Sequence, residues 1–332
     1  MRVGIAGAGG IVPDFLNAAG YIPEMEIVAI CGTERSKDKL NQLATRYQIE
    51  RIYTNYQFML NDAEVEVIYV AVPNHLHYEF AKLALQNKKH VIMEKPFASC
   101  YEEAVELTKL AKDNQLYLFE AISNQYFPNY EKVKDLLPEL GDIKIVEMNY
   151  SQYSRRYDAF KAGEILPVFN PKMSGGALMD INVYNIHFIL GLFGEPVKVQ
   201  YFANLEKGVD TSGILLLMYP SFQCAAIGAK DCKAPLCINI QGDKGYIHSN
   251  SPANTFSDFI HGSNSGGETK YNLHNSRERL YDELKAFTDM YQKKDYEKNC
   301  KQLKHSLQVM AILDEARRQA GIEVQTANIT KL

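Results

Sequence analysis

Short β-branched runs alternate with amphipathic segments of helical period over the first third of the chain. This alternation predicts a parallel sheet covered by helices, because a helix after each strand returns the chain to the same edge of the sheet. The predicted strands are Val3–Ala6, Glu26–Cys31, a short one near Ile52, Val67–Val72, His90–Glu94 and Tyr117–Ala121. The predicted helices open at Pro13, after Ser36, at about His75 (ending near Asn87) and after Ser99.

After Pro128 the pattern changes to longer strand-like segments joined by turns, which predicts a largely antiparallel sheet. These strands are predicted at Ile143–Tyr150, Val197–Leu205, Ile214–Met218, Phe222–Ala229 and Leu236–Gln241. Helices are predicted at Gly176–Phe193, Ser276–Lys293 and Lys301–Ala320, and a mobile surface loop at Ser251–Glu268. The predicted fold class is α/β, with a doubly wound parallel-sheet (Rossmann) domain at 1–121 and an α+β domain at 122–332 that has a large open, mostly antiparallel sheet.

Charge and cysteine content narrow the class of protein. The 332 residues carry a formal net charge of -4 with scattered Lys and Arg, so we expect no nucleic-acid partner. Six cysteines without a C-x-x-C pair fit neither a zinc site nor a disulfide framework, and we expect reduced thiols in a cytoplasmic protein. The N-terminal apolar run is broken by glycines and Pro13, and no apolar stretch is long enough to cross a bilayer, so we expect neither a signal peptide nor a membrane partner.

A glycine-rich turn follows the first predicted strand and precedes a helix. Gly7, Gly9, Gly10 and Ile11 are in the position where backbone N–H groups at a helix N-terminus bind the pyrophosphate of a dinucleotide. Val12 stands where this motif has its third glycine, which moves strand and helix slightly apart. An ordinary tight turn is the alternative.

The end of the second predicted strand discriminates between cofactors. No carboxylate stands directly at this strand end to hold a ribose 2'-hydroxyl, whereas Thr33, Arg35 and Lys37 could hold a 2'-phosphate. Glu34 could reach the hydroxyl instead. The sequence therefore favours NADP as the cofactor over NAD.

Two further segments end predicted strands at the edge where doubly wound sheets bind ligands. The first supplies Pro73, Asn74 and His77, and the second supplies Glu94 and Lys95. A lysine at a buried strand end needs a partner or a function, because ammonium groups are rarely buried alone. The alternatives are a Lys95 paired with Glu94, and histidines that cap a helix.

A third polar group lies on the predicted helix at Gly176–Phe193. Asp180, Tyr184 and His187 stand at i, i+4 and i+7, which places them on one face of an α-helix among apolar neighbours. Such a face is typical of a ligand site. A buried Asp–His pair that stabilises the domain is the competing interpretation for His187.

These segments, in this order, resemble the glucose-fructose oxidoreductase and inositol dehydrogenase (Gfo/Idh/MocA) family over nearly the whole chain. The resemblance implies a nicotinamide cofactor bound between the two domains, with Lys95 beside the nicotinamide and the substrate. With a tyrosine at position 184, the chain resembles the branch of the family that contains the dimeric dihydrodiol dehydrogenases. Where relatives have Trp and Arg before a Phe-Pro segment, this chain has Ser123 and Gln125.

The predicted function is that of an NAD(P)-dependent oxidoreductase acting on a CH–OH carbon of a sugar, polyol or cyclic diol. Tyr184 and Lys95 are the predicted acid–base pair, with Asp180 holding the geometry, although Lys95 alone could move the proton. The predicted substrate-binding residues are Gln125, Arg155 and His187. A cofactor-binding sensor without catalysis and a redox-neutral NAD-dependent glycosidase are the alternatives. A homodimer or homotetramer built on the open sheet face is also expected, because an apolar sheet face needs cover.

Overall fold

The computed structural model describes residues 1–274 and 278–323. By their contacts these divide into two compact units. The first unit comprises residues 1–121 and 278–307, and the second comprises 122–274 and 308–323. By contacts the first unit's N-terminal part ends at residue 121, and residues 278–307 group with it. The division into domains at 1–121 and 122–332 stays a prediction.

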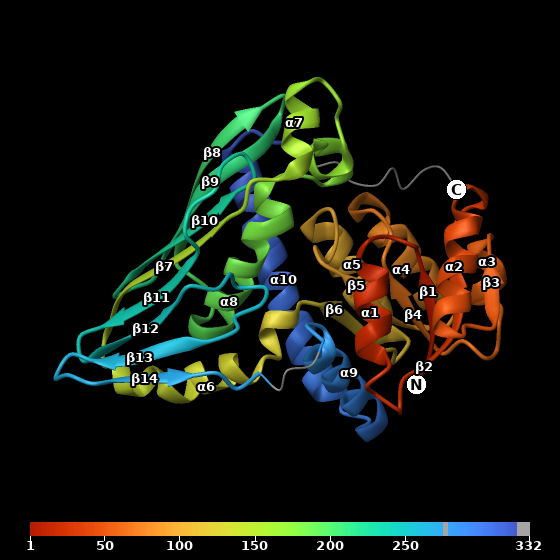
Figure 1. The fold of residues 1–332 in the computed structure, drawn as a ribbon, viewed down its shortest axis with the longest axis horizontal. Coiled ribbons are helices and arrows are strands. Elements are labelled where there is room, and N and C mark those ends of the chain that lie inside the picture. Colours follow the sequence, from red (N-terminus) through yellow and green to blue (C-terminus); the bar gives the residue numbers. More distant parts are fainter. Residues whose placement is uncertain (275–277, 324–332) are drawn as a thin grey trace. The chain divides into compact units, whose positions relative to one another are not determined.

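The first unit is built on a six-stranded sheet in the order β3-β2-β1-β4-β5-β6, in which every neighbouring pair is parallel (Figure 1). The strands are β1 Arg2–Ala6, β2 Glu26–Cys31, β3 Arg51–Tyr53, β4 Val67–Val70, β5 His90–Glu94 and β6 Leu118–Ala121. All six were predicted, with ends that differ by at most two residues. The strand order reverses between β1 and β4, which is the switch point where such sheets bind ligands.

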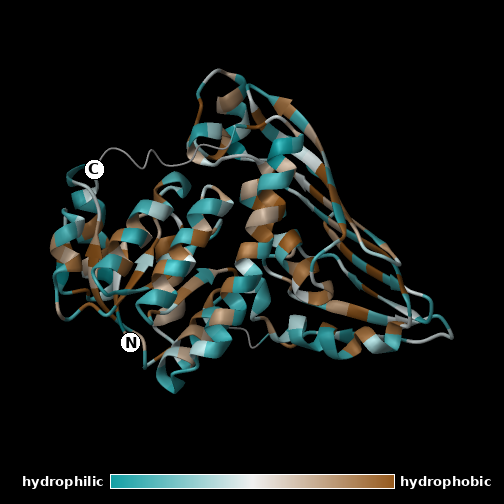
Figure 2. Cartoon of the chain, turned by 180° about the vertical axis from the view of Figure 1, so that it is seen from behind, coloured by the Kyte–Doolittle hydropathy of each residue, from teal (hydrophilic) through white to brown (hydrophobic). Residues whose placement is uncertain are grey.

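Helices follow the strands of this sheet and alternate hydrophobic with hydrophilic residues (Figure 2). They are α1 Ile11–Ala19, α2 Lys37–Tyr47, α3 Tyr56–Leu60, α4 His77–Gln86 and α5 Tyr101–Asp113, with 3-10 turns at η1 Glu34–Ser36 and η2 Asn74–Leu76. Later in the chain, α9 Tyr281–Lys293 also belongs to this unit, and α10 Tyr296–Gln319 begins in it and ends in the second unit. The five-residue α3 was not predicted, because it is too short to show a period. The helix predicted at Ser276–Lys293 corresponds to α9, and Ser276, its predicted first residue, lies outside the described residues.

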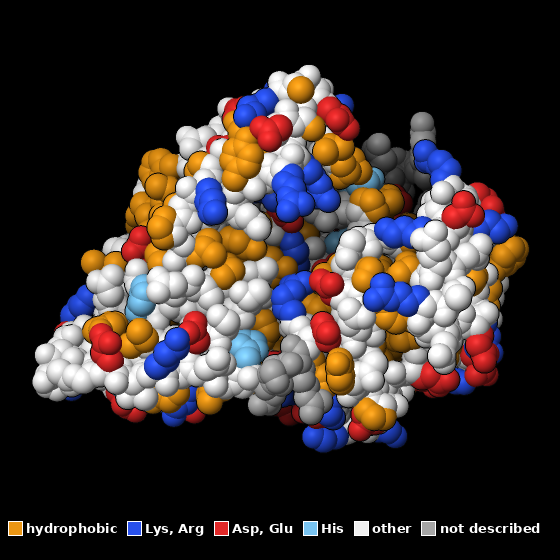
Figure 3. Space-filling model, viewed as in Figure 1, with side chains coloured by type: hydrophobic (Ala, Val, Ile, Leu, Met, Phe, Trp, Pro, Cys, Tyr) orange, Lys and Arg blue, Asp and Glu red, His pale blue; other side chains and the backbone are white. Residues whose placement is uncertain are grey.

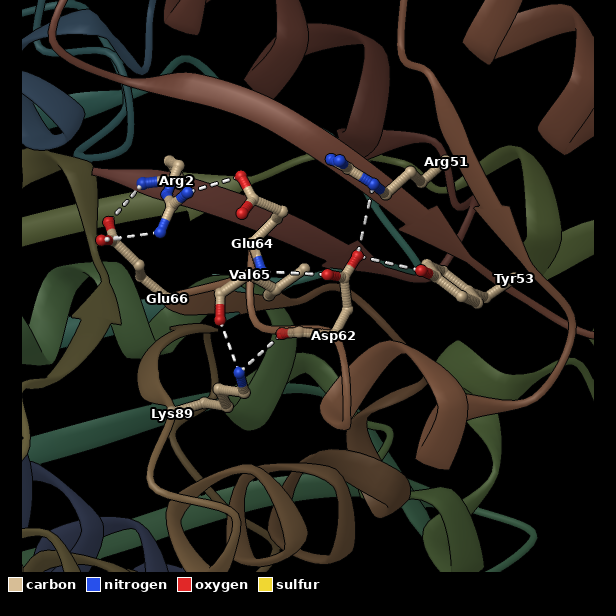
Figure 4. A network of polar contacts seen from close by, with 8 residues as sticks. All are labelled: Arg2, Arg51, Tyr53, Asp62, Glu64, Val65, Glu66 and Lys89. Atoms are coloured by element: carbon tan, nitrogen blue, oxygen red, sulfur yellow. Dashed lines mark hydrogen bonds and ion pairs between the residues drawn. The ribbon is translucent and has the colours of Figure 1, made fainter.

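A network of charged and polar groups closes the amino ends of the strands (Figure 4). The backbone N–H of Arg2 donates to Glu66 at 2.9 Å, and Tyr53 Oη donates to Asp62 at 2.9 Å. Lys89 Nζ donates to the carbonyl oxygens of Asp62 at 2.8 Å and Val65 at 2.6 Å. This edge is occupied by the protein's own side chains, so a ligand site is expected at the opposite edge, where the glycine-rich turn lies.

The second unit is built on an eight-stranded sheet in the order β14-β13-β12-β11-β7-β10-β9-β8. Only β10 and β7 are parallel among the described pairs, so the predicted largely antiparallel sheet is confirmed. The strands are β7 Ile143–Ser151, β8 Lys198–Glu206, β9 Val209–Met218, β10 Gln223–Ala229, β11 Cys237–Gly242, β12 Gly245–Ser249, β13 Phe259–Ser263 and β14 Glu268–Tyr271.

Two strand predictions need correction. The Ser251–Glu268 segment is not a loop throughout, because Phe259–Ser263 pairs with β12 and buries Phe259 almost completely. Its many Ser, Asn and Gly residues form turns on either side of that strand. β9 begins five residues before the predicted Ile214, since its first part carries the buried polar residues Asp210 and Thr211, which conceal a strand pattern.

The helices of the second unit lie beside its sheet. They are α6 Pro128–Leu136, α7 Arg155–Lys161, the π-helix η7 Leu178–Asn182 and α8 Val183–Phe193, with 3-10 turns at η3 Ser123–Gln125, η4 Leu137–Leu140, η5 Pro167–Phe169 and η6 Pro171–Met173. The predicted continuous α-helix at Gly176–Phe193 is therefore wrong in its first turns. A π-turn takes more residues than an α-turn, and such turns occur frequently at functional sites.

The helical stretch Pro171–Phe193 is long and apolar enough to cross a membrane by length and composition. This corrects the expectation that no stretch of the chain reaches that length. However, 78% of its apolar window is buried inside the protein, and it is the one such stretch among the described residues. It is packed as a core helix.

The two faces of the eight-stranded sheet differ. α8 packs on β7 and β10, and on this side Leu215 and Leu217 are completely buried. No described helix covers the other side (Figure 1), where Phe202 is 60% exposed, Ile145 51% and Ile214 43%. Phe202 and Ile214 are register partners on neighbouring strands, so they form a continuous apolar face.

All six cysteines lie in the described residues, and none forms a disulfide. On the face shown in Figure 3, Lys and Arg side chains are intermixed with Asp and Glu. This mixture of charges agrees with the low net charge of the sequence.

Candidate active site

The glycine-rich turn leaves β1 in a conformation that only glycine adopts readily. Gly7 has a φ of +121°, and a Cβ on it would lie 2.3 Å from the carbonyl oxygen of Ala71. The backbone N–H of Gly7 donates to the carbonyl oxygen of Cys31 at 2.8 Å. By contrast, a Cβ on Gly10 would meet nothing within 4 Å. Gly7 is thus required for packing of the turn, and Gly10 leaves open space at the start of α1.

The N-terminus of α1 can accept an anion. Gly10 caps the helix without any side-chain hydrogen bond, so the first N–H groups of the helix, beginning at Ile11, have no side-chain cap. Asp14 in the first turn is ion-paired with Arg279 at 3.6 Å, which offsets its negative charge. An uncapped helix start beside exposed glycines fits the pyrophosphate of a dinucleotide.

The loop after β2 is held by a local cap. Ser36 Oγ accepts from the N–H of Thr33 at 2.9 Å and donates to its carbonyl at 2.8 Å. Glu34 lies 3.8 Å from Lys37 in an exposed ion pair. Arg35 is exposed and makes no ion pair with a described residue. The loop therefore presents Arg35 to solvent and engages Glu34 with its own neighbour.

His77 links the two strand-end loops that flank the site. Its Nδ1 lies 2.9 Å from the carbonyl oxygen of Pro96, and its Nε2 lies 3.0 Å from that of Val72. Burial lowers the pKa of His77 to about 4, and the charge of Lys95 acts in the same direction. The neutral ring carries one N–H, so it donates to one of these two carbonyl oxygens and lies in contact with the other. This linking role was not predicted from the sequence.

Buried carboxyl groups lie below the end of β5. Tyr69 Oη donates to Glu94 at 2.5 Å, and Tyr69 is stacked on Phe15 with ring centroids 3.8 Å apart. Burial raises the pKa of Glu94. Burial and then the charge of Glu94 raise the pKa of Glu283 on α9 well above its ordinary value. These acids are therefore shifted towards their uncharged forms.

The residues predicted to bind the cofactor all lie at the carboxyl ends of β1, β2, β4 and β5 or in the turns that follow: Gly7, Gly9, Gly10, Ile11, Thr33, Arg35, Pro73, Asn74, His77, Glu94 and Lys95. Lys95 follows β5 directly and is half-buried. Their contact with a cofactor stays a prediction.

In the second unit, Asp210 caps the helical segment that carries Asp180 and Tyr184. Its Oδ2 accepts from the N–H of Leu178 at 2.6 Å and from Tyr201 Oη at 2.8 Å. Gly176, with a φ of +118°, lets the chain approach this carboxylate, because a Cβ there would lie 2.1 Å from Asp210 Oδ1.

Asp180 lies on the π-helix and is ion-paired with Lys230, the residue that follows β10. Sequence reasoning did not find Lys230, since fifty positions separate the two and no local pattern marks it. Tyr184 is mostly buried on α8 and lies near Tyr150 of β7, with ring centroids 6.4 Å apart.

The three predicted substrate-binding residues have different surroundings. His187 is completely buried, and Gln125 Nε2 donates to its carbonyl oxygen at 2.9 Å. The neighbouring Asn124 donates to the carbonyl of Tyr184 at 2.7 Å, so both amides hold α8 in place. Arg155 is exposed at the start of α7 and makes no ion pair with a described residue. A substrate role for each stays a prediction.

Lys95 belongs to the first unit, whereas Asp180 and Tyr184 belong to the second. Within the second unit the structure brings Asp180 and Tyr184 onto one continuous helical segment. The pairing of Lys95 with Tyr184 is taken up below as a proposal.

Comparisons with known proteins match both units. A model of the oxidoreductase family with an NAD-binding Rossmann fold matches residues 1–122, and a model of the GFO/IDH/MocA C-terminal domain matches residues 130–248. The scyllo-inositol 2-dehydrogenase (NADP(+)) of Bacillus subtilis is 31% identical over 331 residues, covering 97% of this chain and 98% of that protein. The trans-1,2-dihydrobenzene-1,2-diol dehydrogenase of Xenopus tropicalis is 27% identical over 336 residues, covering 96% and 98%.

Among solved structures, a 3-ketoreductase from Actinomadura kijaniata in complex with NADP and TDP-benzene superposes with a TM-score of 0.85. The two sequences are 22% identical, and the superposition covers 96% of this chain and 97% of the ketoreductase. This similarity confirms the fold.

Asp210 predicts a pH dependence of stability. Burial raises its pKa from the ordinary 3.8 to about 6, so the folded state binds this proton more tightly than the unfolded state. The contribution of Asp210 to stability is therefore greatest below pH 4 and falls by roughly 3 kcal/mol as the pH rises through 6. Asp210→Asn, which keeps an oxygen for the N–H of Leu178, is expected to flatten this fall in melting temperature between pH 4 and 7.

The exposed Asp135→Asn is the matched control and is expected to follow wild type. Identical profiles for Asp210→Asn and wild type would contradict the assignment of this titration to Asp210.

Proposed function

The chain belongs to the GFO/IDH/MocA oxidoreductase family, and on that premise we propose that it transfers a hydride between NADP(H) and the CH–OH carbon of a polyol, sugar or cyclic diol. The resemblance inferred from the motifs is thereby confirmed, and the protein is an oxidoreductase. The observation that carries the proposal is the uncapped N-terminus of α1 beside Gly7 and Gly10, at the same sheet edge as Lys95. Full-length relatives named as inositol and dihydrodiol dehydrogenases support the substrate class.

The residues present fit an NADP molecule. Gly9, Gly10 and Ile11 would hold the pyrophosphate at the helix start, and Thr33 with Arg35 would hold the 2'-phosphate. Such a cofactor, when bound, accepts or supplies the hydride. Arg35 is exposed, and Glu34 is ion-paired with Lys37. Both features favour a 2'-phosphate over a bare ribose hydroxyl.

In the proposed reaction, Tyr184 exchanges the proton of the substrate hydroxyl, and Lys95 orients that hydroxyl. An ammonium beside a phenol favours loss of the phenol proton, which is why the lysine and the tyrosine are assigned as a pair. Asp180 accepts a hydrogen bond from the substrate and holds its position. Gln125, Arg155 and His187 are the proposed surroundings of the substrate. The thiols, none of which forms a disulfide, suit the cytoplasmic location we expect.

A panel of cyclitols, sugars, sugar acids and cyclic diols tests the proposal. Turnover is followed by the absorbance of the reduced nicotinamide, with thermal shift as a measure of binding. Net change in that absorbance with a panel member supports a dehydrogenase. Glycoside cleavage without net change, or cofactor binding without any turnover, would replace it with the glycosidase or the sensor.

We predict that NADP(H) binds at least tenfold more tightly than NAD(H). A charge-assisted contact between Arg35 and a phosphate contributes about 1.5 to 3 kcal/mol, which is sufficient for this preference. Fluorescence titration of both cofactors measures it, and Arg35→Gln is expected to abolish it, while Glu34→Gln leaves it unchanged. A preference for NAD(H) that Glu34→Gln removes would assign the ribose contact to Glu34.

We predict that Tyr184→Phe lowers kcat at least a hundredfold, because general acid–base catalysis contributes about 10² to 10⁴ in rate. The dissociation constant of NADP is expected to stay near wild type. Tyr157→Phe, which removes the hydroxyl that donates to Glu206 on the same unit, is the control and should retain most of the activity. A loss under tenfold in Tyr184→Phe, with a collapse in Lys95→Met, would move proton transfer to Lys95.

We also propose that the open face of the eight-stranded sheet pairs with a second copy of the chain, giving a dimer or a dimer of dimers. An apolar face of this kind is unfavourable in water, and symmetric dimers are the commonest way to cover one. Phe202→Glu is expected to lower the mass measured by light scattering at micromolar concentration. Phe58→Glu, an equally exposed site on α3 at 65%, should leave it unchanged. A wild-type monomer would rule out the assembly.

A further inference from the structure

Lys230 is a buried ammonium group that the proposed mechanism does not use. It follows β10, is 6% exposed as a residue, and its side chain is 8% exposed against 28% for its partner Asp180. Removing an ammonium from water is costly unless an opposite charge compensates for it. Asp180 provides that charge, so the two side chains form an ion pair within the second unit.

The chain brings the two together by a close approach of the π-helix to β10. A Cβ on Gly228 would lie 2.6 Å from the Cβ of Asn182, so glycine is needed at this strand position. Asn182 Nδ2 donates to the carbonyl of Ala226 at 3.0 Å, and Asn185 Nδ2 donates to that of Ile227 at 3.1 Å. Two amides thus hold the helix against the strand, four and three residues before Lys230.

The backbone of Lys230 is held on both sides. Its N–H donates to the carbonyl of Thr211 at 2.8 Å, and its own carbonyl accepts from the N–H of Ser154 at 2.9 Å. These bonds fix the origin of the lysine side chain relative to β9 and to the segment before α7. The direction from which the ammonium reaches Asp180 is therefore set by the sheet.

We propose that Lys230 is a positioning residue of the substrate site, where it holds the Asp180 carboxylate in the orientation that accepts a hydrogen bond from a substrate hydroxyl. This rests on the proposed function. A carboxylate offers about four acceptor sites, so one that is bound to an ammonium still accepts from other donors. Without the lysine, the aspartate side chain would rotate about χ1 and χ2 and lose its fixed geometry.

The pair also defines the class of substrate. The charges of one ammonium and one carboxylate cancel, so the Lys230–Asp180 pair has no net charge although Asp180 still offers a hydrogen-bond acceptor. A second cation, Arg155, follows Ser154 in the chain, and the backbone N–H of Ser154 donates to the carbonyl of Lys230. The site therefore suits neutral polyhydroxyl rings or their acids, and a cationic amino sugar is disfavoured.

The test compares Lys230→Met, Lys230→Arg, Asp180→Asn and the double variant Lys230→Met/Asp180→Asn, using the best substrate of the panel with NADP. Lys233→Met, at an exposed lysine three positions on, is the matched control. Lys230→Met is expected to lower kcat/KM at least tenfold, mainly through KM, with the dissociation constant of NADP unchanged. Lys230→Arg should recover most of the loss, because it restores a cation at this position.

The double variant is expected to be no more than about threefold worse than the worse single variant, because residues that act as a unit are not additive. If Lys230→Met does not fold, the double variant, which removes both charges, is compared with Asp180→Asn alone, and a further tenfold loss overturns the proposal. Kinetics of Lys230→Met equal to those of Lys233→Met overturn it too. A wild-type protein that neither binds nor converts any panel member overturns the proposed function, and this inference with it.

Discussion

The close packing of the π-helix and α8 against β10 is the constraint on which the candidate site residues of the second unit depend. Gly228 has no side chain where Asn182 crosses the strand, and any larger residue would separate helix from sheet. Because the helix lies so close, Asp180 reaches Lys230 and the helix start reaches the Asp210 carboxylate. The π-turn follows from these attachments, since it adjusts the path of the helix between two fixed points.

In the first unit, burial shifts the titratable groups near the end of β5 towards their neutral forms. His77 has its pKa lowered to about 4 and is used as a link between two loops, while the pKa values of Glu94 and Glu283 are raised by burial. Carboxyl groups whose pKa is raised carry less negative charge, so they would oppose an anion bound at this edge less strongly than ordinary carboxylates. The helix N-terminus and the exposed Arg35 then supply the positive potential that an anionic cofactor requires.

The chain departs from family motifs at positions that support α8. Gln125 donates to the carbonyl of His187, and its neighbour Asn124 donates to that of Tyr184. Asn182 donates to the carbonyl of Ala226 on β10. Gln125 stands where the resemblance leads us to expect an Arg, and in this chain its amide donates to the backbone of α8.

Local patterns were sufficient for the parallel sheet, the glycine-rich turn and the segments that carry Lys95 and Tyr184, because strand periodicity, turn residues and strand-end polarity are all short-range signals. They failed where stability comes from distant partners. The beginning of β9 is concealed by Asp210, a polar residue that caps a helix thirty-two positions earlier in the chain. The π-turn and the Lys230–Asp180 pair exist only once β10 and the helix are packed together, and no spacing within either segment encodes that contact.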